Sequence, residues 1–121
     1  MTPLVQPFVH QATLSLKSGA DRAAPGGAVT LALCGVWDHD GRCRWPHHSG
    51  LHLVRATAVL RTVFVSVPVE EQLVRARIDA QLGVGTLTGP DGRTSSWRLR
   101  DTRAADPDPD EAALGVRLVS G

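Results

Sequence analysis

The sequence is short of several residue types, and these shortages narrow the kinds of protein it can be. It has no tyrosine and no asparagine, and Lys17 is its only lysine. Its 13 basic residues nearly balance its 12 acidic residues. Nonspecific binding of nucleic acid normally needs a pronounced basic excess. We therefore expect no nucleic-acid partner, while the ordinary apolar content argues against general disorder.

Long apolar runs are also missing. Nowhere do about eighteen apolar residues follow one another, so we expect no membrane-spanning segment. The first residues, MTPLVQPFVHQ, lack the basic start and the long apolar core of a signal peptide, which predicts a cytoplasmic location. In that reducing compartment the two cysteines are expected to be free thiols or metal ligands rather than a structural disulfide.

The length of 121 residues allows one domain, residues 1–121, with a real core. Alternation of apolar residues predicts a half-buried strand at 8–17, with His10 on its apolar face as a hydrogen-bonded core residue. A glycine-rich loop follows at 18–27, and we expect a second strand at 28–37. Residues 51–67 favour extended structure, but their length predicts a bend near 55–58, with a short helix there as the alternative.

The clearest helix is predicted at 68–82, PVEEQLVRARIDAQL. Pro68 suits a first helical turn, and Gly83 can end the helix. A hairpin should follow, with strands at 84–88 and 94–100 around a turn at Gly89–Gly92. After a polar linker, 114–121 is expected to add an edge strand. The predicted fold class is therefore α+β: a mainly antiparallel sheet of about five to six strands packed by one long helix at about 68–82.

The predicted helix has two opposed apolar stripes, and a sheet can cover only one of them. The stripes consist of Val69, Leu73, Ala76 and Ala80 on one side and of Val74, Ile78 and Leu82 on the other. We expect a homodimer through this helix, with Val74, Ile78 and Leu82 meeting either a partner subunit or a loop of their own chain.

Residues 34–52, CGVWDHDGRCRWPHHSGLH, hold both cysteines and four of the five histidines. Zinc prefers tetrahedral sites built from Cys and His side chains. A four-residue turn at 38–41 would place both sulfurs on one face of a hairpin, and the chain after Pro46 would bring a histidine beside them. The hypothesis is a zinc site formed by Cys34, Cys43, His47 and His48.

The same segment allows other interpretations. There is no CxxC pair, and a hairpin turn of two or three residues would separate the cysteines. The cysteines and tryptophans could simply pack, with the histidines at the surface. A cysteine nucleophile with a histidine base, such as Cys34 with His47, is a further alternative, although no oxyanion donor can be named.

The central third of the chain is locally basic. Arg42, Arg44, Arg55 and Arg61 would suit a small anionic ligand, although they are also typical of a solvated surface. No phosphate-binding loop accompanies them, since APGGA at 24–28 matches neither a Walker loop nor the dinucleotide-binding fingerprint. The leading hypothesis is a small binding or interaction module without catalysis, and the alternative is a small enzyme that uses a cysteine and a histidine from 34–52.

Overall fold

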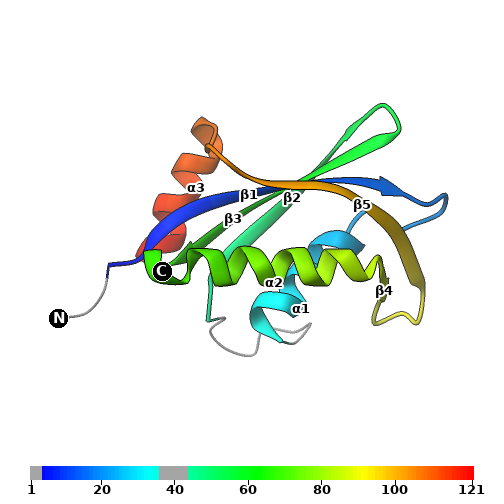
Figure 1. Cartoon of the computed structure of the whole chain (residues 1–121), viewed down its shortest axis with the longest axis horizontal. Coiled ribbons are helices and arrows are strands. Elements are labelled where there is room, and N and C mark those ends of the chain that lie inside the picture. The colour runs from blue at the N-terminus through cyan, green and yellow to red at the C-terminus, as the bar shows by residue number, and fades with distance from the viewer. Residues whose placement is uncertain (1–3, 36–43) are drawn as a thin grey trace.

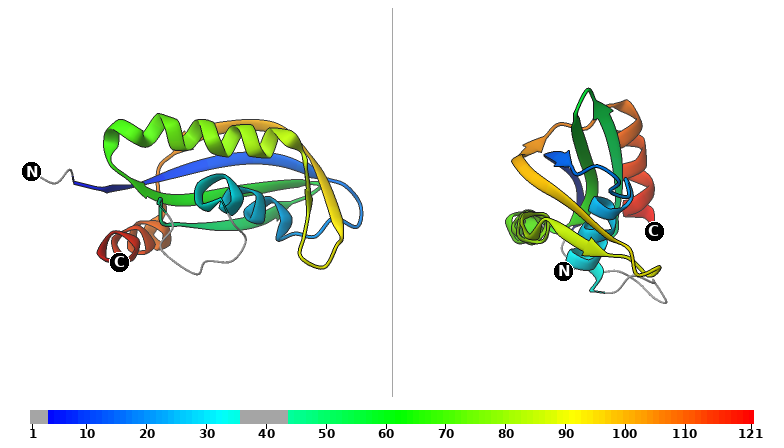
Figure 2. Two further views of the ribbon diagram at one scale, coloured as in Figure 1. Left: turned by 90° about the horizontal axis from the view of Figure 1, so that it is seen from below. Right: turned by 90° about the vertical axis from the view of Figure 1, so that its right-hand side faces the viewer.

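The computed structural model describes residues 4–35 and 44–121. Five antiparallel strands form one curled sheet in the order β2-β3-β1-β5-β4, which confirms the α+β class. The elements are β1 (Gln6–Leu16), α1 (Ala24–Cys34), β2 (His47–Val54), β3 (Thr57–Ser66), the 3-10 turn η1 (Pro68–Glu70), α2 (Glu71–Val84), β4 (Thr86–Thr88), β5 (Thr94–Ala105) and α3 (Pro109–Ser120). Figures 1 and 2 show α1 and α2 on one side of the sheet, which we call the inner face, and α3 on the other, outer face.

β1 is the central strand and is covered on both faces. It pairs with β3 on one side and with β5 on the other. Its side chains alternate as predicted, so that Leu14 faces the inner core and is fully buried. On the outer face Val9 is only 2% exposed, because α3 packs over β1 and β3.

The inner core lies between the sheet and the helices α1 and α2. Trp97 of β5 closes one end of it and donates a hydrogen bond from Nε1 to the carbonyl of Leu82, at 2.9 Å. The large apolar side chains that are almost wholly buried here include Leu14, Val29, Trp45, Phe64, Val74, Ile78 and Leu82. None of the helices in the described part of the chain is long and apolar enough to cross a bilayer.

The predicted strand at 28–37 is wrong, because residues 24–34 form helix α1. Pro25 occupies the first turn, and Gly35, with φ 80°, ends the helix and donates its N–H to the carbonyl of Leu31 at 2.9 Å. The segment is apolar on nearly every side, so its pattern fits a strand as well as a helix. The rest of the predicted strand, 36–37, lies outside the described residues.

The predicted edge strand at 114–121 is also wrong, because these residues belong mainly to helix α3. Its start has a complete capping box: Asp108 accepts from the N–H of Glu111, and the Glu111 carboxylate accepts from the N–H of Asp108. Gly115 lies so close to Pro7 that an added Cβ would stand 2.7 Å from the Pro7 Cβ. A side chain there would push α3 away from the sheet.

The other predicted elements differ less from the structure. The bend near 55–58 is confirmed as a tight turn between β2 and β3, where Arg55 has φ 59°, and the turn at 89–92 joins β4 to β5. The helix predicted at 68–82 is divided into η1 and α2. The single long helix and the sixth strand are not confirmed, since the described residues form three α-helices and five strands.

The two stripes of α2 have different surroundings. Val74, Ile78 and Leu82 are buried in the core of their own chain, because α2 lies across the inner face of the sheet beside α1. The opposite stripe is open to solvent: Val69 is 88% exposed and Leu73 is 42% exposed. The apolar surface that a partner subunit would cover is therefore the Val69 and Leu73 side.

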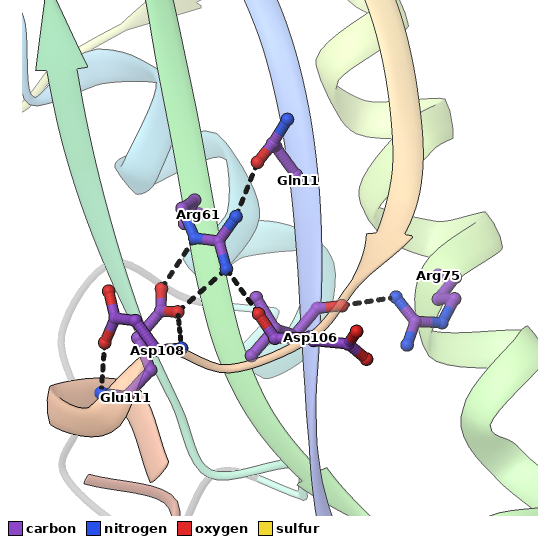
Figure 3. A network of polar contacts seen from close by, with 7 residues as sticks. Gln11, Arg61, Arg75, Asp106, Asp108 and Glu111 are labelled. Atoms are coloured by element: carbon purple, nitrogen blue, oxygen red, sulfur yellow. Dashed lines mark hydrogen bonds and ion pairs between the residues drawn. The ribbon is translucent and has the colours of Figure 1, made fainter.

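Arg61 of β3 holds the start of α3 against the outer face (Figure 3). Its Nε donates to Glu111 Oε2 and its Nη2 to Glu111 Oε1, each at 2.8 Å, so the pair is bidentate. Further bonds run from Arg61 to Gln11 of β1 and to the backbone carbonyl of Asp106. The pKa of Glu111 lies below its ordinary value, chiefly because Arg61 donates to its carboxylate, with burial acting in the opposite direction.

We predict that Glu111→Gln lowers the free energy of unfolding by about 1–3 kcal/mol, the usual value of a partly buried hydrogen bond to a charged group. The folded-state pKa of Glu111 is lowered, so the ion pair stabilises the fold above the pKa of the unfolded state and stops doing so as the pH falls through the folded-state pKa. The difference between wild type and variant should therefore be constant near neutral pH and shrink below about pH 4.5.

Urea unfolding at several pH values measures this difference. Asp110→Asn is the matched control, because it removes an exposed carboxylate from the same helical turn and leaves the Arg61–Glu111 pair intact. If the two variants lose the same free energy of unfolding, the stabilisation comes from negative charge at the start of α3 and not from the bond to Arg61.

Candidate functional site

Trp45 fixes the point at which the chain enters β2. Trp45 is 2% exposed, and two guanidinium groups lie over its ring, with Arg44 Cζ at 4.3 Å and Arg77 Cζ at 5.1 Å from the ring centroid. Its Nε1 donates to Glu70 Oε1 at 3.2 Å, and Glu70 also pairs with Arg44. These contacts set the position of His47, the first residue of β2.

The ring of His47 is held from two sides. Nδ1 lies 3.0 Å from the backbone carbonyl of Trp45, and Nε2 lies 3.2 Å from Thr30 Oγ1 of α1. A carbonyl oxygen can only accept, so Nδ1 carries the proton in this arrangement. In the neutral ring Nε2 is then the acceptor, and the Thr30 hydroxyl donates to it.

Cys34, the last residue of α1, lies beside the same ring. Its sulfur is 3.9 Å from His47 Nδ1. Cys34 is disulfide-bonded, contrary to the expectation of free thiols. Because Cys34 ends a helix rather than a strand, the hairpin register used to place its sulfur does not apply. The proposed turn at 38–41 and Cys43 itself lie outside the described residues.

His47 and His48 point in different directions because they are neighbours on one strand. His47 pairs with Phe64 and faces α1, whereas His48 is exposed and belongs to the opposite face. Of the predicted zinc ligands that the structure describes, it brings Cys34 and His47 together and leaves His48 apart. Within 4–35 and 44–121 no group of three or more His, Cys, Asp or Glu side chains is placed to hold a metal ion.

A pocket of about 400 Å³ lies between α1 and β2, next to His47. Its polar lining consists of Arg22, Thr30, His47, His48 and Ser49, and no carboxylate of the described residues joins them. Ser49 Oγ lies 2.8 Å from Thr62 Oγ1, so either hydroxyl can donate to the other. When Thr62 donates, the Ser49 hydroxyl is available to a ligand. The pocket thus presents the Arg22 guanidinium and the Ser49 hydroxyl, and none of its described lining residues carries a negative charge.

The three described arginines of the central third, Arg44, Arg55 and Arg61, do not form one surface. Arg44 pairs with Glu70, Arg61 pairs with Glu111, and Arg55 lies at the exposed turn between β2 and β3. Arg42 lies outside the described residues. The cation of the pocket is Arg22, which precedes α1 and which the sequence pattern did not single out. Its role depends on α1 packing beside β2, a contact between segments that the sequence cannot reveal.

His10 belongs to a second polar cluster, on the inner face under α2. It is 3% exposed and hydrogen-bonded, as predicted for a core histidine. Its Nε2 lies 2.7 Å from Asp79 Oδ1, and its Nδ1 lies 3.0 Å from Arg75 Nη1. Arg75 also donates to the carbonyl of Val9 and pairs with Glu71. Each group has a partner and the cluster connects β1 to α2, which is a structural role.

Comparisons with models of known protein families, with curated proteins and with solved structures find no match for this chain.

Proposed function

We propose that this protein is a binding module without catalysis, and that the pocket between α1 and β2 takes a small anionic ligand. The observation that carries this proposal is that two donors, the Arg22 guanidinium and the Ser49 hydroxyl, line the pocket, with no carboxylate among the described lining residues. Thr30 and His47 also line it and are bonded to each other. An arginine with a neighbouring hydroxyl group suits a phosphate or carboxylate group, because the guanidinium can donate two parallel bonds.

The test is a titration of the protein with inorganic phosphate, pyrophosphate and citrate, followed by NMR shifts of the backbone amides. We predict the largest shifts at Thr30, His47 and Ser49, and a loss of affinity of at least about tenfold in Arg22→Gln. Arg55→Gln is the control, because Arg55 is an exposed arginine at the far turn of the same strand pair. Binding that Arg22→Gln and Arg55→Gln weaken equally would contradict this site.

The second candidate function is zinc binding, which the closeness of the Cys34 sulfur to His47 favours. A disulfide sulfur is not a thiolate ligand, so this hypothesis applies to the reduced chain. We keep the cytoplasm as the proposed location, and in that compartment the disulfide of Cys34 would be open. A thiol enzyme would also need the reduced form of Cys34. In addition, Nδ1 of His47 would have to lose the proton that it donates to the Trp45 carbonyl before it could accept the proton of the thiol.

Zinc content is measured on protein purified under reducing conditions without chelator. We predict one zinc per chain in the wild type, with loss of both metal and thermal stability in Cys34→Ser and in His47→Ala. His52→Ala is the control, and it should keep the metal. His48→Ala decides between the two adjacent histidines: the structure predicts that it keeps zinc. Reduced wild-type protein without stoichiometric zinc would exclude this function.

We also propose that the chain forms a homodimer through α2, using the exposed stripe with Leu73 rather than the buried one. Leu73→Glu should convert a dimer to a monomer at high micromolar concentration, measured by light scattering. Val116→Glu, at a 65% exposed position of α3, is the control and should leave the mass unchanged. A monomeric wild type at this concentration would refute the dimer. Ile78 is unsuitable for this test, because a charge at its buried position would unfold the chain.

A further inference from the structure

β5 has an open edge along most of its length. β4 pairs only with residues 94–96 of β5, which continues to Ala105. Among the elements of 4–35 and 44–121, none pairs with this side of β5 beyond Trp97. Figure 2 shows the corresponding part of β5 at the border of the sheet. An open strand edge is a template for pairing with another extended chain.

The backbone groups on this edge can be assigned from the ladder. Trp97 donates its N–H to Gly85, away from β1, at 2.9 Å. In an antiparallel ladder the residues alternate between the two sides, so the N–H and carbonyl of Leu99 also point to the open edge. A bulge at Arg100 shifts the register, and beyond it Thr102 and Ala104 occupy the equivalent positions.

The side chains next to the edge are basic on one face of the sheet and apolar on the other. Arg98, Arg100 and Arg103 are exposed on the outer face, where Arg98 pairs with Ser15 and Arg103 with Gln11. Asp101 is the one carboxylate between them. On the inner face the corresponding residues are Leu99, Thr102 and Ala104, of which Leu99 and Ala104 are apolar. The outer-face side chains of a strand placed along this edge would therefore meet three arginines and one aspartate.

A cavity of about 410 Å³ adjoins the inner side of this edge. It lies between the end of β5 and the start of α2, with Phe8, Glu71 and Arg75 among its lining residues. A side chain from a strand on the edge of β5 would enter it beside Ala104. Such pockets for alternate side chains give selectivity when an extended peptide adds to a sheet.

We propose that the open edge of β5 binds an extended peptide by strand addition, with acidic residues at every second position and apolar residues between them. The acidic side chains would pair with Arg98 and Arg103 on the outer face, and the apolar ones would lie on the inner face near the cavity. Pairing between the β5 edges of two copies of this chain is unfavourable, because the arginines of one edge would lie opposite those of the other and repel them. The charge of the edge thus selects an acidic strand over a second copy of itself.

Fluorescence anisotropy with labelled peptides of about eight residues tests the proposal. A peptide of alternating Glu and Val should bind, whereas one of alternating Lys and Val should not. In a Glu and Pro peptide the charge is kept, but proline replaces valine at the inner-face positions whose N–H groups would face β5, so it should bind at least tenfold more weakly. In the double variant Arg98→Glu, Arg103→Glu the affinity for the Glu and Val peptide should fall at least tenfold, and in Arg55→Glu it should be unchanged.

Hydrogen exchange on the wild-type protein gives a second measurement that needs no variant. The Glu and Val peptide should slow exchange of the amides of Leu99, Thr102 and Ala104. Equal binding of the Glu and Pro peptide, or unchanged exchange at these amides, would overturn strand addition. Tighter binding of a single-stranded or duplex oligonucleotide to the same arginines would overturn the choice of a peptide partner, and no binding at millimolar peptide would overturn the site.

Discussion

β1 has paired strands on both sides and helices on both faces, and the rest of the structure depends on this position. Because β1 is enclosed in this way, side chains on both of its faces are buried. One of these buried side chains, His10, is polar. A buried imidazole without partners would cost free energy, so it needs a donor and an acceptor nearby. Arg75 and Asp79 of α2 supply them, which places α2 directly across the inner face.

Two arginines attach helices to the two faces of this strand. Arg75 extends from α2 to the carbonyl of Val9 and is 8% exposed, while Arg61 extends from β3 to the start of α3. Burial of a guanidinium is costly unless its donors are satisfied, and both groups have carboxylate and carbonyl partners. The helices are therefore held by directional bonds, at the start of α3 and in the N-terminal two thirds of α2, and by apolar packing along their length.

The surfaces that we propose for binding lie at the margins of the sheet. The anion pocket adjoins β2 at one edge, and the peptide edge is the free part of β5 at the other side. The described side chains at the centre of the sheet, such as Leu14 and Phe64, are buried and closely packed. At the margins, arginines such as Arg22 and Arg98 can face solvent, and backbone groups of β5 have no neighbouring strand in the described part of the chain.

The elements whose patterns are local could be predicted from the sequence alone. The alternation around His10 predicted β1, Gly89–Gly92 predicted a turn, and the acidic start of 68–82 predicted a helix, because periodicity and turn chemistry act over a few residues. The helices α1 and α3 were missed: the first is apolar all round, and the capping box of the second, Asp108 with Glu111, lay in a segment interpreted as a linker. Of the predicted zinc ligands that the structure describes, it places Cys34 and His47 together and His48 apart, while the anion pocket needs Arg22 beside β2. These contacts join α1, and the residues just before it, to β2. The two segments are distant in the sequence, so their contact depends on how the chain packs in three dimensions.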